Sequence, residues 1–159
     1  MTNNKIKLLF MDVDGTLTDG KIYMGENGEV MKAFDIKDGY AIAHMLPEMG
    51  IVPVIITGRT SKIVENRAKE LGITELFQGR NDKLDVMHEV MKKYNCTKEN
   101  CAYIGDDVFD ILCMKECVIA ACPADAIQDV KDICQYICKN KAGDGAVREY
   151  ISFLKMENY

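Results

Sequence analysis

The chain has 159 residues, of which 48% are hydrophobic and 28% charged, and its net charge is −5. This length and balance predict one globular domain over 1–159, and the acidic excess argues against a nucleic-acid partner, which would need clustered Lys and Arg. No apolar run is long enough to span a bilayer, and residues 1–5 carry no signal-peptide core, so we expect a cytoplasmic protein without a membrane partner.

Apolar runs and turn signals predict strands that alternate with helices. The predicted strands are 8–11, 51–56, 76–77, 101–104, 118–121 and a short one near Tyr136. The predicted helices run over 39–49, from a cap at Thr60 or Ser61 to Leu71-Gly72, from Asp82 to about Tyr94, and from Asp144 or Gly145 through Leu154. This alternation indicates an α/β fold, a doubly wound parallel sheet whose ligands bind at the carboxyl ends of the strands.

A β-hairpin is predicted at about 20–34, within this α/β pattern. Two short β-prone runs, 21–24 and 30–34, flank a turn at 25–29 that is rich in Gly and Asn. The hairpin inserts after the first strand. It either folds onto its own domain or supplies a contact between subunits.

The seven cysteines are odd in number and contain no C-x-x-C pair. Such spacing fits neither a disulfide framework nor a zinc site. We therefore expect reduced thiols that pack as small hydrophobes.

Two carboxylates one residue apart, Asp12 and Asp14, end the first apolar run. Residues i and i+2 of an extended segment point the same way, so both carboxylates can face one point in space. They repel each other unless a cation lies between them, and Mg²⁺ suits such oxygen ligands. Gly15 then turns the chain and Thr16 offers a hydroxyl to a bound oxyanion. An Asp-Gly turn after an ordinary strand would explain this stretch equally well by itself.

Three more polar groups fall at the same predicted edge of the sheet. Thr57-Gly58 ends the second strand, Lys83 opens the helix after the third, and Gly105-Asp106-Asp107 with Asp110 follows the fourth. Singly, each has a structural explanation: the start of a helix, a solvated surface lysine, or a helix cap. Those explanations do not account for the fact that all of these polar groups fall at the same end of one sheet.

The whole set suits phosphoryl transfer through a covalent aspartate. Asp12 is the predicted nucleophile and Asp14 the general acid/base. Lys83 and Thr57, with Mg²⁺, would balance the charge on the phosphoryl oxygens. Asp106 completes the predicted metal site with Asp12 and the backbone carbonyl of Asp14, while Asp107 or Asp110 orients Lys83.

At these residues the sequence resembles the haloacid dehalogenase-type phosphohydrolases. Asp12-Val-Asp-Gly-Thr16, Thr57, Lys83 and Gly105-Asp-Asp-x-x-Asp110 match the four motifs of that superfamily in order. The resemblance implies a Rossmann-like core and a Mg²⁺-dependent phosphatase. Only a hairpin and single helices separate the motifs, so no cap domain is expected, and the open site takes a macromolecule or is closed by a neighbouring subunit.

A closer resemblance, to 3-deoxy-D-manno-octulosonate (KDO) 8-phosphate phosphatases, rests on four segments: 19–25, 32–39, 56–67 and 143–149. It implies a phosphorylated sugar acid as substrate and a homotetramer in which hairpins associate and a neighbour helps close each site. It also implies a set of substrate-binding residues: Asp14, Asp35, Lys37, Asp38, Gly39, Thr57, Gly58, Arg59, Arg67 and Lys83.

Two departures bear on the substrate. Many relatives carry an arginine where this chain has Ala43. Relatives that act on nine-carbon acids tend to carry glutamate where this chain has Arg59, which favours the eight-carbon acid.

The alternatives are a phosphatase of a nine-carbon keto-acid 9-phosphate and a non-catalytic assembly module. A receiver domain would need an aspartate after the third strand, where this chain reads Phe77-Gln-Gly-Arg-Asn81.

Overall fold

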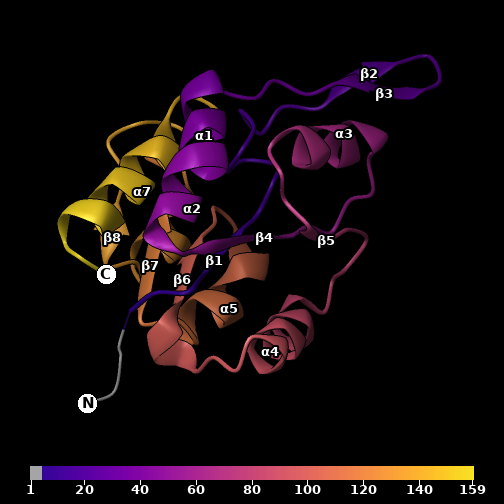
Figure 1. Cartoon of the computed structure of the whole chain (residues 1–159). Helices are drawn as coiled ribbons and strands as arrows, with labels where there is room; N and C mark the ends of the chain where they lie inside the picture. Colours follow the sequence, from indigo (N-terminus) through magenta and orange to yellow (C-terminus); the bar gives the residue numbers. More distant parts are fainter. Residues whose placement is uncertain (1–4) are drawn as a thin grey trace.

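The computed structural model describes residues 5–159, so residues 1–4 of the predicted domain lie outside the described part (Figure 1). Its main sheet has six strands in the order β5-β4-β1-β6-β7-β8, and each neighbouring pair is parallel. The strands are β1 (Leu8–Met11), β4 (Val52–Ile56), β5 (Glu75–Phe77), β6 (Cys101–Ile104), β7 (Ile119–Cys122) and β8 (Tyr136–Ile137). The chain builds outward from β1 on one side and then returns to build on the other. The order therefore reverses at β1, which is where such sheets bind ligands.

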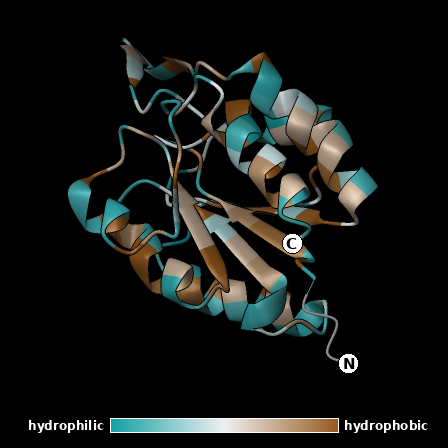
Figure 2. Cartoon of the chain, turned by 90° about the vertical axis from the view of Figure 1, so that its left-hand side faces the viewer, coloured by the Kyte–Doolittle hydropathy of each residue, from teal (hydrophilic) through white to brown (hydrophobic). Residues whose placement is uncertain are grey.

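Helices cover both faces of this sheet, as the alternating pattern predicted. Leu9 and Met11 of β1 pack into a cluster with η1 (Ala41–Met45), which continues α1 (Ile36–Tyr40), and with α2 (Leu46–Met49), α3 (Lys62–Glu70) and α7 (Ala146–Met156). Leu8 and Phe10 pack into a second cluster with α4 (Lys83–Lys93), α5 (Ile111–Lys115) and α6 (Gln128–Lys131). Alternate residues of a strand point to opposite faces, so a strand with helices on both sides must be apolar throughout. Figure 2 shows these hydrophobic strands between the helical layers.

The hairpin forms a separate two-stranded sheet of β2 (Tyr23–Gly25) and β3 (Gly28–Met31). Its turn is tighter than predicted, with only Glu26 and Asn27 between the strands, because Gly28 adopts a φ of +112° and already pairs with Gly25. Figure 1 shows the hairpin projecting beyond the sheet and its helices. Its apolar side chains stay exposed, with Met24 at 64% and Val30 at 61%, so the tip does not fold back onto its own domain.

The helical segment after the hairpin begins earlier than predicted. Asp35, and not the residue before Gly39, is its N-cap, and its carboxylate accepts the backbone N–H groups of Lys37 and Asp38. The segment continues from α1 through a π-helical turn, η1 (Ala41–Met45), into α2. Pro47 lacks an N–H and its ring crowds the preceding turn, which the wider π turn accommodates.

Two helices, α5 and α6, were not predicted. They have five and four residues, too few for a 3.6-residue period to stand out. The single-turn 3₁₀ segments η2 (Lys98–Asn100) and η3 (Val108–Asp110) were missed for the same reason. The helix starting after Asp82 was predicted with nearly the right bounds, but the Asp82 carboxylate pairs with Arg80 and does not cap it.

All seven cysteines are free thiols, and Cys101, Cys113, Cys122 and Cys138 are buried in the core. This confirms their predicted role as small hydrophobes. Across residues 5–159, no helix is both long and apolar enough to cross a bilayer.

Candidate active site

An open cleft of about 310 Å³ lies where β1, β4 and β6 end. Parallel strands bring their carboxyl ends to one edge, so motifs far apart in the sequence meet there. The residues that line the cleft are Asp12, Asp14, Thr57, Gly58, Arg59, Asn81, Lys83, Asp107, Phe109 and Asp110. All four predicted catalytic residues are in this set. Sequence reasoning missed Asn81 and Phe109, because neither belongs to a motif.

The buried ammonium of Lys83 joins two carboxylates in the floor of the cleft. Its Nζ lies 2.9 Å from Asp12 Oδ1 and 2.9 Å from Asp110 Oδ1. Burial by itself would lower the pKa of Lys83, but the two carboxylates outweigh it and raise that pKa. Lys83 is therefore a permanent cation, and this excludes the surface-lysine explanation of its position.

Asp110, and not Asp107, orients Lys83. The Oδ1 atom of Asp110 also accepts the Tyr103 hydroxyl at 2.8 Å, and its Oδ2 accepts the backbone N–H groups of Asp106 and Asp107 at 3.0 and 3.3 Å. Gly105 permits this close approach, because a Cβ there would lie 2.5 Å from Asp110 Cγ. The exposed Asp107 carboxylate instead caps η3, where it accepts from the backbone N–H groups of Val108 and Asp110.

Three carboxylates form a candidate metal site. Asp12, Asp106 and Asp110 each offer an oxygen, and these oxygens lie within 4.8 Å of one another. Burial and then the neighbouring carboxylates raise the pKa values of Asp12 and Asp106. Asp110 already accepts bonds at both oxygens. The charge left between Asp12 and Asp106 is therefore what a divalent cation with oxygen ligands would neutralise.

Thr16 differs from the sequence prediction, because its buried hydroxyl does not face a substrate oxyanion. It donates to Asp106 Oδ1 at 3.0 Å and so holds a candidate metal ligand. Gly15, with φ of +87°, lets the chain pass this carboxylate, since a Cβ there would lie 2.1 Å from Asp106 Oδ2. The Asp-Gly pair therefore does more than form a surface turn.

Asp14 lies at the side of the cleft and faces cations. Lys32 Nζ lies 2.5 Å from Asp14 Oδ1, and Arg59 Nε lies 3.9 Å from Asp14 Oδ2. Both cations also pair with Glu29, at 3.0 Å for Lys32 and 3.4 Å for Arg59. Sequence reasoning missed Lys32 and Glu29, because a charged residue in a short hairpin gives no sign of which residue it meets.

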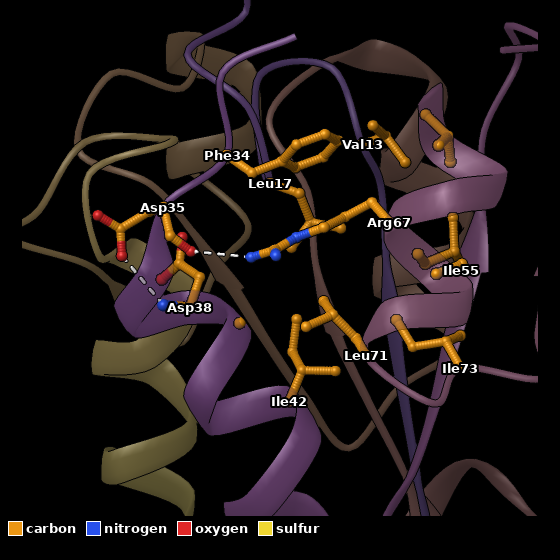
Figure 3. A pocket seen from close by; sticks show the side chains of 13 residues that line it. Val13, Leu17, Phe34, Asp35, Asp38, Ile42, Ile55, Arg67, Leu71 and Ile73 are labelled. Carbon is orange, nitrogen blue, oxygen red and sulfur yellow. Dashed lines mark hydrogen bonds between the residues drawn. The ribbon is translucent and has the colours of Figure 1, made fainter. Parts of the chain in front are cut away.

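Several predicted substrate-binding residues lie elsewhere. Asp35, Asp38, Gly39 and Arg67 line a narrow crevice between α1 and α3, and Figure 3 shows the Arg67 side chain reaching across it toward Asp35. Arg67 donates to the Asp35 carbonyl at 3.3 Å. The free space of about 10 Å³ holds at most one water, far less than a sugar acid.

Asp38 has an evident structural contact, whereas the Lys37 side chain forms no hydrogen bond or ion pair among the described residues. Asp38 Oδ1 accepts the Arg148 N–H at 2.8 Å, in the first turn of α7. Lys37 is exposed on α1. The structure thus brings Asp14, Thr57, Gly58, Arg59 and Lys83 into the cleft and leaves the other five outside it.

Comparison with known proteins agrees with this architecture. The haloacid dehalogenase-like hydrolase family matches residues 56–151. The 3-deoxy-D-manno-octulosonate 8-phosphate phosphatase of Yersinia pestis is 45% identical over 144 residues, 91% of this chain and 76% of that protein. The chain belongs to the haloacid dehalogenase-like hydrolases. Because it belongs to this family and its relatives are phosphatases, it is a phosphoric monoester hydrolase.

Solved structures extend the match to three dimensions. A 3-deoxy-D-manno-octulosonate 8-phosphate phosphatase from Yersinia pestis superimposes with a TM-score of 0.92 at 43% identity, covering 96% of this chain and 82% of that one. One from Moraxella catarrhalis, in complex with magnesium, phosphate and KDO, gives 0.89 at 40% identity, covering 94% and 86%. The Moraxella catarrhalis structure holds magnesium, and this chain presents three carboxylates suited to a divalent metal.

Proposed function

We propose that the chain hydrolyses KDO 8-phosphate to KDO and phosphate. The proposal rests on one observation above all: four predicted catalytic residues line the same cleft, namely Asp12, Asp14, Thr57 and Lys83. The chain is also 45% identical to a phosphatase of that substrate. We propose further that residues 1–159 act as one phosphatase domain in the cytoplasm.

In the proposed reaction, these side chains act in two steps. An Asp12 carboxylate oxygen attacks phosphorus, and the bond to the sugar oxygen breaks as Asp14 donates a proton to that oxygen. The products of this step are free KDO and an aspartyl phosphate. Asp14 then removes a proton from water, the resulting hydroxide attacks phosphorus, and phosphate leaves while the Asp12 carboxylate is restored. Lys83 and Thr57 balance the charge of the phosphoryl oxygens in both steps.

We assign Mg²⁺ as the metal, held by the carboxylates of Asp12 and Asp106 and by the backbone carbonyl of Asp14. The oxygen-only donor set and the uncompensated charge between Asp12 and Asp106 support this ion. When bound, Mg²⁺ neutralises negative charge that develops on the transferring phosphoryl group.

The sugar acid lies at the mouth of the cleft in this proposal, next to Gly58 and the half-exposed Arg59. An arginine there suits a carboxylate, which it can bind through two parallel hydrogen bonds. The remaining substrate-binding predictions lie outside the cleft. They would meet a substrate only across a contact between subunits: Asp35, Lys37, Asp38, Gly39 and Arg67.

A homotetramer built through the hairpin is part of the proposal. The exposed apolar side chains of the hairpin support it, because a monomer gains nothing by leaving such a projecting surface in water. These side chains are Ile22, Met24, Val30 and Met31. Sedimentation equilibrium of the native chain beside Met24→Lys tests this: we expect four subunits, and fewer for the variant.

The decisive experiment measures phosphate release with Mg²⁺ and with excess chelator. The substrates are KDO 8-phosphate, a nine-carbon keto-acid 9-phosphate and a simple hexose phosphate, and Asp12→Asn serves as the inactive control. Metal-dependent preference for the eight-carbon substrate supports the proposal. Preference for the nine-carbon acid would retain the mechanism and replace the substrate, whereas substantial turnover by Asp12→Asn would refute the nucleophile.

A further inference from the structure

The hairpin contributes a buried cation to the candidate active site. The Lys32 side chain has no exposed surface, although the residue directly follows β3 of a hairpin that projects into solvent. Its ammonium contacts Asp14 at 2.5 Å and Glu29 at 3.0 Å. We propose that Lys32 is a positioning residue, which holds the Asp14 carboxyl group in the orientation for proton transfer. The proposal rests on the proposed function of Asp14.

The contacts of Asp14 show why it needs such a residue. Its side chain is 19% exposed, and its second ion pair among residues 5–159 is with Arg59, which is 3.9 Å away and half exposed. A contact at that distance to a half-exposed guanidinium restrains a carboxyl group weakly. The short bond from a fully buried ammonium is therefore the main restraint on the Asp14 rotamer.

Glu29 in turn fixes Lys32. Besides its bond to the ammonium, its carboxylate accepts from the Ser61 hydroxyl at 3.4 Å and from Arg59 at 3.4 Å. Ser61 precedes α3, so Glu29 ties the hairpin to the loop after β4. A buried lysine requires such partners, since an unpaired buried charge is costly. The network thus runs from the hairpin through Lys32 to Asp14.

This arrangement predicts which step depends on Lys32. Positioned proton transfer contributes about 10²–10⁴-fold to rate, and a displacement of about 1 Å can cost about 10²-fold. Attack by Asp12 does not itself use the Asp14 proton. A leaving group that departs as a stable anion therefore tolerates a misplaced Asp14, whereas an alkoxide does not.

The test compares benzyl phosphate, whose alkoxide needs a proton, with p-nitrophenyl phosphate, whose phenolate does not. We expect Lys32→Met to slow single-turnover cleavage of benzyl phosphate about 10²-fold. The first-turnover burst of p-nitrophenolate should stay within about 3-fold of the native rate. A later, slow steady state is expected, because Asp14 also activates the water in the second step. Lys21→Met, at an exposed lysine of the same hairpin segment, should match the native chain on both substrates.

Equal slowing of cleavage for both substrates, or no slowing for benzyl phosphate, would overturn the positioning role. If Lys32→Met does not fold, the same pair of substrates is applied to Glu29→Gln, which retains the Lys32–Asp14 bond and weakens its support. For Glu29→Gln as well, the proposal is supported only if cleavage of benzyl phosphate slows and cleavage of p-nitrophenyl phosphate does not. Neither substrate is a sugar acid, so a wrong assignment of KDO 8-phosphate would leave this test intact.

Discussion

Asp38→Asn should make the protein more stable at neutral pH while leaving its stability at pH 4 nearly unchanged. The Asp38 carboxyl is only 2% exposed, and its Oδ2 atom has no hydrogen-bond partner among the described residues. Burial, and to a smaller extent the charge of Asp35, raises the pKa of Asp38 from 3.8 to about 6, against the opposing backbone bond from Arg148. Between pH 3.8 and about 6, the folded chain therefore holds a proton at this site that the unfolded chain has released.

The sign of the effect follows from this difference. A carboxyl whose folded-state pKa is raised contributes fully to stability below its unfolded value of 3.8, and that contribution is lost as pH rises to about 6. The interval corresponds to about 3 kcal/mol of unfolding free energy, as an upper limit. Asparagine cannot ionise, yet its Oδ1 still accepts the Arg148 N–H at the start of α7. The variant should thus gain up to about 3 kcal/mol at pH 7 relative to the native chain.

Urea unfolding at pH 4, 5, 6 and 7, followed by circular dichroism, measures this difference. The control is Asp85→Asn, an exposed carboxylate on α4, for which we expect less than about 1 kcal/mol at every pH. A stability difference for Asp38→Asn that does not change between pH 4 and 7 would refute the reasoning, as would a less stable variant at pH 7.

The same variant tests the substrate-binding prediction for Asp38. If Asp38 serves only to cap α7, the KM of Asp38→Asn for the sugar-acid phosphate should stay within about 3-fold of the native value. A larger rise in KM, with kcat retained, would instead support contact with substrate across a subunit boundary.

Two further substitutions probe the cleft. Lys83→Met should lower the free energy of unfolding in urea at pH 7 by about 3–5 kcal/mol and abolish turnover, because it leaves Asp12 and Asp110 buried without their cation. Lys92→Met, at an exposed lysine of the same helix, is its control. Equal stability of the two variants would contradict the prediction. Gly15→Ala should lose the rise in melting temperature that Mg²⁺ gives the native chain, because the new Cβ displaces Asp106. Gly72→Ala is matched to it, with a similar φ of +72° and no atom within 4 Å, and should keep the rise.

The sequence by itself determined the fold class and most of the motif residues that line the cleft. A strand buried on both faces must be a continuous apolar run, so 8–11 and 101–104 were predicted with their observed bounds. Parallel strands share one carboxyl edge, so Asp12, Thr57 and Lys83 were placed together without knowledge of the strand order. Gly72, which follows the last turn of α3 with φ of +72°, ended that helix as predicted.

Only the tertiary structure decided which charged groups meet. Asp107 and Asp110 are equivalent in the sequence, and the turn after β6 turns Asp110 inward to Lys83 and leaves Asp107 in solvent. The Lys32–Asp14 bond, and the separation of Arg67 from the cleft, likewise depend on how the hairpin and α3 pack. Local patterns report which residues are apolar or can turn, because those are properties of neighbouring residues. The partner of a charged side chain is set by segments that are far apart in the sequence and adjacent only after folding.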